Sequence, residues 1–360
     1  MKSRFATGLV VGKFCPLHKG HQHLIDAAVR SCDHLLVISY SKPEFDHCSR
    51  ANRERWISQL YPTVTALVID DQSLQRLCRV RRIEWRPLPH NAAPDLEHRD
   101  FVAWLCLTIL GTQVDVVFTS EAYGDGFAGF LTEYFRSRGR LAADVTHVSV
   151  DLARNTVPVS GTVVRRDPFA SRSLLAPVVY TDFVERVAIL GGESSGKSTL
   201  AQALADHFET TWAREYGREL WQVRRGQLRR EDMLEIATTQ VDREFRLGLE
   251  ARRFLFCDTT PLTTAFYSQA MFGQVDPRLD QLAARSYDHT ILCAPDFEFV
   301  QDGTRRTEAF RTQQHEWYEH RLRSADAAFT LVSGSVENRL ATVAALLNQG
   351  AATRSPLASG

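Results

Sequence analysis

The sequence contains a glycine-rich stretch whose residue types suit phosphate binding. Residues 191–198 read Gly-Gly-Glu-Ser-Ser-Gly-Lys-Ser, which fits the pattern GxxxxGK[ST], between an apolar run at 187–190 and a helical pattern at 197–208. Glycines let such a loop curl so that its N–H groups meet phosphate oxygens, while the lysine reaches the β- and γ-phosphates and the final hydroxyl can bind Mg²⁺. The stretch therefore predicts an ATP-binding P-loop. The expected ATP contacts are Gly191, Glu193, Ser194, Ser195, Gly196, Lys197, Ser198 and Thr199.

Two carboxylates and an arginine further along the chain could complete a phosphoryl-transfer site. Asp258 ends the apolar run 254–257, where P-loop proteins place a carboxylate near Mg²⁺, so we expect Ser198 and Asp258 to bind the metal. Glu215 opens the string Glu-Tyr-Gly-Arg, in a part of the chain where small-molecule kinases build their acceptor site. The string Asp-Gly-Thr-Arg-Arg at 302–306 suggests a lid whose Arg305 meets the transferring phosphoryl group, with a solvated turn as the alternative.

A second phosphate-binding pattern lies near the N-terminus. Residues 12–21 read Gly-Lys-Phe-Cys-Pro-Leu-His-Lys-Gly-His, and the three-residue spacing of His18 and His21 at a helix start puts both rings on one side. Two imidazoles beside a helix N-terminus suit a triphosphate. A metal site is the alternative, although no third ligand stands at a suitable spacing. Residues 160–165, Ser-Gly-Thr-Val-Val-Arg, offer capping hydroxyls and an arginine for polyphosphate oxygens.

The elements that must position these residues alternate between apolar runs and helical patterns, which is typical of α/β folds. The first series has expected strands at 7–14, 34–39, 66–69, 114–119 and 145–150 and helices at 21–32, 50–60 and 127–138. The second has strands at 187–190, 254–257, 290–293 and 328–332 and helices at 197–208, 231–252, 307–323 and 336–347. The segment 167–184 has two prolines and little periodicity. We therefore expect domains at 1–172 and 173–350, followed by a disordered tail at 351–360.

Length and composition agree with two ordinary globular domains. A chain of 360 residues exceeds the usual size of one core, and a formal net charge of zero argues against a dedicated nucleic-acid binder. The seven cysteines are scattered without a CxxC pair, so neither a disulfide framework nor a zinc site is expected. With no signal-peptide pattern and no apolar run of membrane-spanning length, we expect a cytoplasmic protein without a membrane partner.

Together these motifs resemble a known family. The GxFxPxHxGH stretch at 12–21 and the SGTxxR stretch at 160–165 look like the two signatures of the HIGH-type nucleotidyltransferase superfamily. The domain order, the linker at 165–169, and the strings at 119–121, 187–198, 215–218 and 302–303 are similar to the bifunctional NadR family. Its members join a nicotinamide mononucleotide (NMN) adenylyltransferase domain to a ribosylnicotinamide kinase domain. The resemblance spans residues 8 to 347.

The resemblance implies a fold, a pair of reactions and a set of site residues. The fold would be a Rossmann-like nucleotidyltransferase followed by a P-loop kinase, both with parallel sheets flanked by helices. The reactions would be phosphorylation of ribosylnicotinamide to NMN and adenylylation of NMN to NAD and pyrophosphate, with ATP and Mg²⁺. In the first domain the implied ATP-binding residues are Gly12, Phe14, His18, Gly20, His21, Ser160, Thr162 and Arg165, and the expected catalytic residues of the two domains are His18, His21, Lys197, Glu215 and Asp258.

Two departures from the family pattern qualify these expectations. Thr260 stands where many relatives have an acidic residue, which leaves open whether Asp258 or Glu215 takes the acceptor proton. Some members carry an N-terminal helix-turn-helix domain, but the first apolar run begins by residue 7, so we expect no DNA-binding domain. A nucleotidyltransferase with another acceptor and a nucleotide sensor fused to the kinase remain alternatives, and the sequence is compatible with a homo-oligomer.

Overall fold

The structure, a computed structural model, describes residues 4–139, 143–301 and 305–353. The chain divides into two compact units, Met1–Asp182 and Phe183–Gly360, so the division falls later than the boundary expected after residue 172. The reason lies in contacts of the connecting segment with helix α2 (Arg50–Leu60). The short helix α7 (Pro177–Tyr180) packs on α2, and the Asp182 carboxylate accepts a 2.6 Å hydrogen bond from the Trp56 indole and pairs with Arg55.

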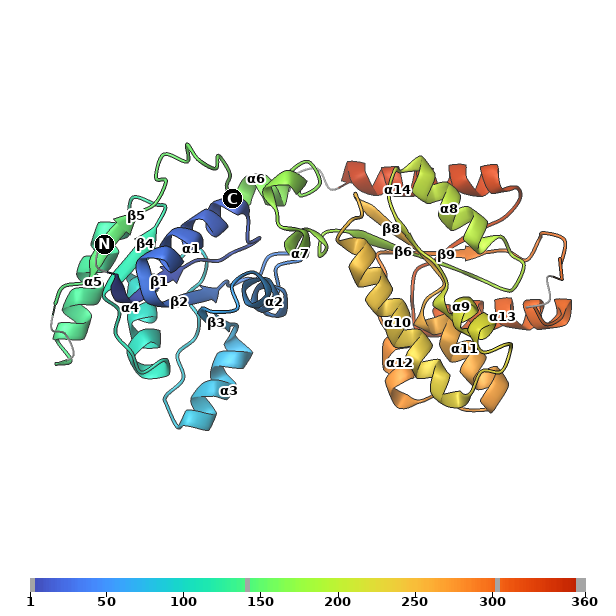
Figure 1. The fold of residues 1–360 in the computed structure, drawn as a ribbon, viewed down its shortest axis with the longest axis horizontal. Coiled ribbons are helices and arrows are strands. Elements are labelled where there is room, and N and C mark those ends of the chain that lie inside the picture. Colours follow the sequence, from blue (N-terminus) through green and yellow to red (C-terminus); the bar gives the residue numbers. More distant parts are fainter. Residues whose placement is uncertain (1–3, 140–142, 302–304, 354–360) are drawn as a thin grey trace. The chain divides into compact units, whose positions relative to one another are not determined.

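The first unit is built on five parallel strands in the order β3-β2-β1-β4-β5 (Figure 1). These strands are β1 (Phe5–Val11), β2 (Cys32–Tyr40), β3 (Thr65–Ile69), β4 (Val116–Thr119) and β5 (Thr146–Ser149). The chain moves outward from β1 in one direction and then returns to the other side, so the order reverses between β1 and β4. In sheets of this kind ligands bind outside the carboxyl ends of the strands at that reversal.

Helices cover both faces of this sheet. The remaining helices of the unit are α1 (Lys19–Ser31), α3 (Asp71–Arg81), α4 (Asp95–Trp104) with a π-helical turn at Leu105–Ile109, α5 (Gly124–Arg136) and α6 (Gly161–Arg166), followed by a 3-10 turn at Arg172–Leu174. Residues of α3, α4 and α5 share one buried cluster with Leu9, Leu36 and Ile38 of the strands. Two of these helices, α3 and α4, were not expected from the sequence. In α3, Leu74 and Cys78 are buried at helical spacing, a pattern that the sequence analysis missed.

The second unit has its own five-stranded parallel sheet, in the order β10-β9-β6-β8-β7. Its strands are β6 (Glu185–Gly191), β7 (Trp212–Ala213), β8 (Phe254–Asp258), β9 (His289–Cys293) and β10 (Thr330–Val332). The central strand β6 is bonded to β8 on one side and β9 on the other. The P-loop follows β6, so it lies at the carboxyl end of the middle of the sheet.

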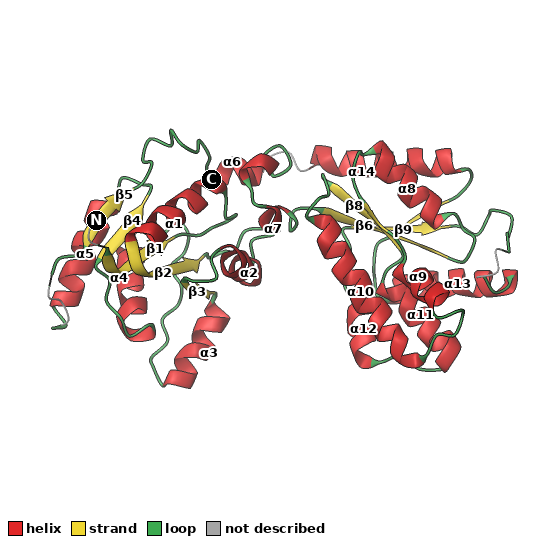
Figure 2. Ribbon diagram, in the orientation of Figure 1, coloured by secondary structure: helices red, strands yellow, loops and turns green. Residues whose placement is uncertain are grey.

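The helices of the second unit form two layers around this sheet (Figure 2). They are α8 (Lys197–His207), α9 (Tyr216–Val223), α10 (Arg230–Gly248), α11 (Pro261–Phe272), α12 (Pro277–Ala283), α13 (Glu308–Ser324) and α14 (Val336–Thr353). Helices α8 and α14 pack together on one face, and α10 and α13 lie on the other. The tail expected at 351–360 is helical up to Thr353, because α14 continues to that residue; its last seven residues lie outside the described part of the chain.

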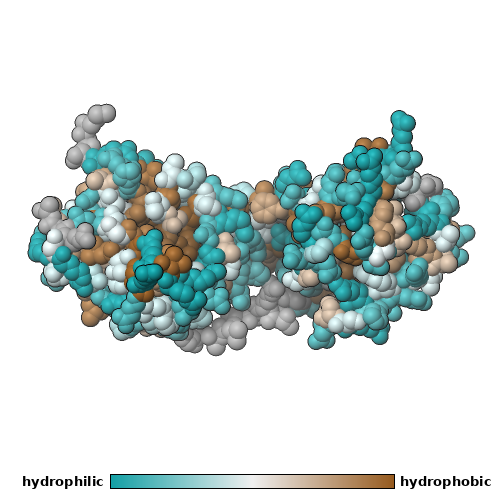
Figure 3. Space-filling model, turned by 90° about the horizontal axis from the view of Figure 1, so that it is seen from below, coloured by the Kyte–Doolittle hydropathy of each residue, from teal (hydrophilic) through white to brown (hydrophobic). Residues whose placement is uncertain are grey.

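The surface seen in Figure 3 is mostly hydrophilic, with hydrophobic residues gathered in smaller areas on each unit. Within the described ranges, no helix combines the length and the apolar character that a bilayer crossing requires.

Candidate active sites

The segment between β1 and α1 forms the floor of a site in the first unit. The Gly12 amide donates a 3.1 Å hydrogen bond to the Ile38 carbonyl, which joins the start of the segment to β2. Phe14 is 1% exposed and meets the His21 ring edge-on, with 5.1 Å between ring centroids. Phe14 was expected among the ATP contacts. In the structure it lies buried behind His21 and fixes the direction of that ring.

His18 and His21 lie together, as their spacing at a helix start indicates. Their rings are stacked, with centroids 3.7 Å apart and planes within 12°. His18 caps α1, and its Nδ1 atom accepts a 3.3 Å hydrogen bond from the His21 amide. A neutral His18 therefore carries its proton on Nε2, where it can be donated to a ligand. Gly20 allows this close approach, because a Cβ atom there would lie 3.1 Å from Nδ1 of His18.

Both histidines are held in the neutral form. Burial lowers the pKa of His18 to about 4, and the positive charges of Arg154 and Arg165 act in the same direction. Burial and the neighbouring His18 lower the pKa of His21 well below its ordinary value. The buried Nδ1 atom of His21 has no hydrogen-bond partner among the described residues. The pair can thus offer hydrogen bonds to a phosphate, while the positive charge at this site must come from other side chains.

The start of α6 forms an adjoining wall of this site. Ser160 caps the helix, and its hydroxyl accepts a 3.3 Å hydrogen bond from the Val163 amide. Arg165 donates to the Cys15 carbonyl at 2.5 Å and to the Thr162 hydroxyl at 3.2 Å, and its guanidinium lies 4.1 Å from the centre of the Phe45 ring. The two sequence signatures are therefore brought together. His18, Gly20, His21, Ser160 and Gly161 line one cavity of about 110 Å³.

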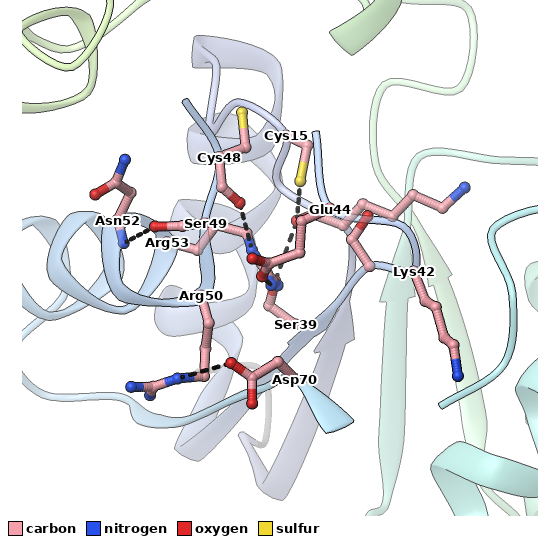
Figure 4. A network of polar contacts seen from close by, with 12 residues as sticks. Cys15, Ser39, Lys42, Glu44, Cys48, Ser49, Arg50, Asn52, Arg53 and Asp70 are labelled. Atoms are coloured by element: carbon pink, nitrogen blue, oxygen red, sulfur yellow. Dashed lines mark hydrogen bonds and ion pairs between the residues drawn. The ribbon is translucent and has the colours of Figure 1, made fainter. Parts of the chain in front are cut away.

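A buried arginine, Arg53, lies in a network of polar contacts next to the segment that follows β1 (Figure 4). The Arg53 side chain is fully buried and donates hydrogen bonds to the Ser39 hydroxyl at 2.8 Å, the Cys48 carbonyl at 3.1 Å and the Glu44 carboxylate at 2.7 Å. The Ser39 hydroxyl in turn donates to the Lys13 carbonyl at 3.1 Å. Arg53 thus braces the loop through Ser39. The sequence analysis missed it because an arginine in a helical pattern is typical of a solvated face.

The same cavity has a further wall that the sequence analysis did not assign. Its residues come from the carboxyl ends of β4 and β5, and they include Ser120, Glu121, Asp151 and Arg154. Arg154 forms an ion pair with Glu121, with 2.8 Å between Nη2 and Oε1. The string Thr-Ser-Glu at 119–121 was used only as part of the family resemblance and not as a site prediction. No sequence motif indicated Asp151 or Arg154.

The P-loop forms the floor of a separate site in the second unit. Gly191 has a φ of +147°, and a Cβ atom there would lie 2.8 Å from the Cys293 carbonyl oxygen, so the loop needs glycine at this point. The Ser195 hydroxyl and the Lys197 ammonium both donate to the Gly192 carbonyl, at 2.7 and 2.8 Å. Gly196 precedes α8 with a φ of +77°. Ser198 and Thr199 then lie in the first turn of α8.

Two P-loop side chains reach the segment before α13. Glu193 accepts hydrogen bonds from the Tyr267 hydroxyl at 2.8 Å and the Arg306 amide at 2.7 Å. The Ser194 hydroxyl accepts a 3.1 Å hydrogen bond from Arg305, which also donates to the Val300 carbonyl. Arg305, expected on a lid, therefore lies beside the P-loop. Residues 302–304 of the expected lid lie outside the described residues.

The two candidate carboxylates lie close to the P-loop and interact with each other. Burial raises the pKa of Asp258, opposed by a hydrogen bond with Ser198 and by the charge of Lys197. Burial also raises the pKa of Glu215, and the charge of Asp258 raises it further. The buried Oδ1 atom of Asp258 has no hydrogen-bond partner among the described residues. These features place Asp258 beside Ser198 with an oxygen available to a ligand.

The Ser198 and Asp258 oxygens fit Mg²⁺, which prefers hard oxygen donors. This ion commonly uses one or two carboxylates and completes its shell with water and substrate phosphates. Across the described ranges, no group of three or more His, Cys, Asp or Glu side chains could hold a metal. A phosphate-assisted site at Ser198 and Asp258 does not require such a group.

A cavity of about 350 Å³ lies against the P-loop. Its charged lining includes Glu193, Lys197, Glu215 and Arg218, and its apolar lining includes Trp221, Met233, Ile236 and Met271 from α9, α10 and α11. The volume falls within the usual range for small-molecule sites, and the mixture of many apolar groups with a few charges is typical of them. Sequence reasoning placed Glu215 and Arg218 at an acceptor site but missed the apolar walls.

The folds and the two cavities define a class of protein. It joins a nucleotidyltransferase-type unit, with two signature motifs at the carboxyl end of its sheet, to a P-loop kinase-type unit. A family model described as an AAA domain matches residues 186–339, which include the P-loop.

The chain belongs to the NadR family. The trifunctional NAD biosynthesis/regulator protein NadR of Salmonella typhimurium (strain LT2) is 30% identical to it over 310 residues, covering 83% of this chain and 71% of the relative. A crystal structure of NadR protein in complex with NR has a TM-score of 0.68 at 19% identity and covers 96% of both chains. Another, in complex with NAD and AMP-PNP, has a TM-score of 0.67 at 18% identity and covers 99% of both. The expected family and fold class are confirmed.

Proposed function

We propose that this chain makes NAD from ribosylnicotinamide in two ATP-dependent steps. In the second unit, the 5′-hydroxyl of ribosylnicotinamide attacks the γ-phosphorus of ATP; the bond to the β,γ-bridging oxygen breaks, and NMN and ADP form. In the first unit, an NMN phosphate oxygen attacks the α-phosphorus of ATP, the bond to the α,β-bridging oxygen breaks, and pyrophosphate leaves with the electron pair. Family membership supports this assignment, and the presence of two separate cavities, each beside a predicted phosphate-binding motif, carries it.

The second unit offers separate groups for the nucleotide and the acceptor. Lys197 would contact the β- and γ-phosphates, and Ser198 and Asp258 would hold Mg²⁺, which neutralises phosphate charge when bound. Glu215 lines the cavity beside Arg218, whereas Asp258 interacts with Ser198. We therefore assign proton acceptance from the 5′-hydroxyl to Glu215. Its raised pKa suits a general base, because a stronger base takes the proton more readily.

In the first unit, the two neutral histidines would donate hydrogen bonds to the substrate, and an arginine would supply positive charge. His18 can donate from Nε2, and the neutral His21 ring can donate to the α-phosphate, where negative charge grows during the attack. Arg165 would bind polyphosphate oxygens. Most of the acceleration would come from holding the two reactants in line and from stabilising charge, because the step needs little covalent help from the protein.

Incubation of the purified full chain with ATP, Mg²⁺ and ribosylnicotinamide tests this proposal. Formation of NAD supports both activities, and formation of NMN alone supports the kinase step and removes the adenylyltransferase step. Separate incubation with NMN, ATP and Mg²⁺ measures the second step by itself. If neither mixture yields a product from protein whose fold is verified by circular dichroism, the proposal is wrong.

A further inference from the structure

A tightly bonded turn follows β5 on the wall of the first-unit cavity. The Asp151 carboxylate accepts hydrogen bonds from three successive amides, those of Asn155 at 2.9 Å and of Thr156 and Val157 at 3.1 Å. Both Asp151 and Arg154 have a φ of +52°, a region that side chains other than glycine rarely adopt. Such a backbone persists only where its surroundings determine it. The turn therefore presents Arg154 to the cavity from a fixed position.

The Arg154 side chain can exchange its ion-pair partner, Glu121, for a ligand. Its ion pair with Glu121 measures 2.8 Å, and the two side chains are 43% and 50% exposed. Water screens a pair this exposed, so breaking it costs little. A polyanion in the cavity would offer the guanidinium several oxygens in place of one carboxylate, in the geometry that arginine binds best.

The cavity also needs a cation that the histidines do not supply. His18 and His21 are neutral near pH 7, and the charge of Arg154 contributes to lowering the pKa of both. Arg165 is bonded to the Cys15 carbonyl and the Thr162 hydroxyl. Arg165 does not line the cavity, whereas Arg154 does, close enough to the histidine pair for its charge to act on both rings.

The position of Arg154 indicates which phosphates it meets. Its segment runs from the end of β5 to Ser160, so the wall that contains Arg154 adjoins the signature that the resemblance assigns to ATP. In an in-line displacement the attacking group enters opposite the leaving group. A side chain beside the ATP signature is consequently expected near the leaving pyrophosphate rather than near the attacking phosphate of NMN.

We propose that Arg154 binds the β- and γ-phosphates of ATP in the first unit, exchanging Glu121 for phosphate oxygens, and stabilises the pyrophosphate that leaves. This inference rests on the proposed adenylyltransferase activity and adds a binding residue outside both sequence signatures. The same contact serves the reverse reaction, in which pyrophosphate attacks NAD and regenerates ATP and NMN.

Kinetics of Arg154→Ala in both directions test the proposal. The matched control is Arg86→Ala, because Arg86 forms a comparable ion pair with Asp100, at 2.9 Å and with exposures of 45% and 46%, and does not line the cavity. Loss of a charge-assisted contact should raise the KM for ATP and for pyrophosphate by roughly tenfold to a hundredfold. The KM for NMN and for NAD should stay within about twofold, and Arg154→Lys should recover part of the loss, because it keeps the charge.

Three outcomes would overturn the inference. Equal kinetics of Arg154→Ala and Arg86→Ala would show that Arg154 binds no substrate. A raised KM for NMN and NAD with an unchanged KM for pyrophosphate would place Arg154 at the acceptor phosphate. A lowered kcat with a lowered Tm and no change in any KM would make its role structural.

Failure of the adenylyltransferase assignment would look different. In that case the unaltered chain would form no NAD, and the role of Arg154 would be tested by measuring ligand binding instead of reaction rates. Inorganic pyrophosphate would be titrated calorimetrically into Lys197→Ala protein, whose P-loop site is weakened, and into the same protein with Arg154→Ala. Binding about tenfold weaker in the double variant would support the phosphate contact, and equal binding would overturn it.

Discussion

Replacing His21 by alanine is expected to slow NAD formation far more than it weakens ATP binding. The ring is fixed between His18, with centroids 3.7 Å apart, and the edge of Phe14 at 5.1 Å. Its buried Nδ1 atom has no hydrogen-bond partner among the described residues. A ring held in this way is positioned before the reaction begins, so a hydrogen bond from it would stabilise charge that develops in the transition state rather than charge already present in ATP.

The size of the effect follows from this role. Removing one preorganised donor costs about 3–4 kcal/mol of transition-state stabilisation, which is roughly a hundredfold to a thousandfold in kcat. Loss of the ring contacts costs on the order of 1 kcal/mol and falls on stability instead. Because burial lowers the pKa of His21 well below its ordinary value, the ring is already neutral at pH 6. Titration of His21 in the free protein should therefore leave kcat/KM flat between about pH 6 and 8.

Steady-state assays with NMN and ATP measure this prediction, and ribosylnicotinamide phosphorylation by the second unit serves as the internal control. His23→Ala is the matched variant, because His23 belongs to the same helix and does not line the cavity. A raised KM for ATP with an unchanged kcat would make His21 a binding contact only. Full activity of His21→Ala would refute the reasoning about this motif.

Three further predictions concern the second unit and the division of the chain. Lys197→Ala should abolish ribosylnicotinamide phosphorylation and spare NAD formation from supplied NMN; loss of both activities in folded protein would mean that the sites are not independent. Chains cut after Asp182 should fold separately, because each unit has its own buried clusters, and insoluble fragments that bind no ATP would contradict this division. Burial raises the pKa of Glu244 to about 7, so its contribution to stability is full below pH 4.5 and is lost as the pH rises to about 7. Urea unfolding should show a loss of about 3 kcal/mol between pH 4.5 and 8 that is absent in Glu244→Gln, and identical pH profiles would show that Glu244 is ionised in the folded state.

The sequence predicted those parts of the sites that local chemistry determines. A P-loop needs glycine where the backbone passes close to another strand, as Gly191 does beside the Cys293 carbonyl. A capping histidine followed by glycine and a second histidine places two rings on one side of a helix start, which is the arrangement of His18 and His21. In both cases the residues that determine the local structure lie within about ten positions of one another, so a single stretch of sequence predicts that structure.

The walls of both cavities escaped prediction because distant segments form them. Trp221 and Met271 face the P-loop cavity only because α9 and α11 pack beside α10. Helix α11 is apolar on most sides, with buried residues from Pro261 to Phe266, so it lacks the one-sided pattern that reveals a helix. Arg154 is positioned by a turn in which backbone amides donate hydrogen bonds to the Asp151 carboxylate. Because the donors are backbone groups, no sequence motif indicates this turn.

One residue of each candidate site has a buried polar atom for which the described residues provide no hydrogen-bond partner: Nδ1 of His21 in the first unit and Oδ1 of Asp258 in the second. Burying such an atom without a partner costs free energy. Burial also opposes the charged form of each group, since it lowers the pKa of His21 and raises that of Asp258. A bound Mg²⁺ would change both conditions at Asp258, because the ion gives Oδ1 a partner and favours the ionised carboxylate, and a bound triphosphate would accept a hydrogen bond from the neutral His21 ring. Each buried atom thus lowers the free energy of unfolding of its unit until a ligand binds. ATP with Mg²⁺ should therefore stabilise both units against unfolding.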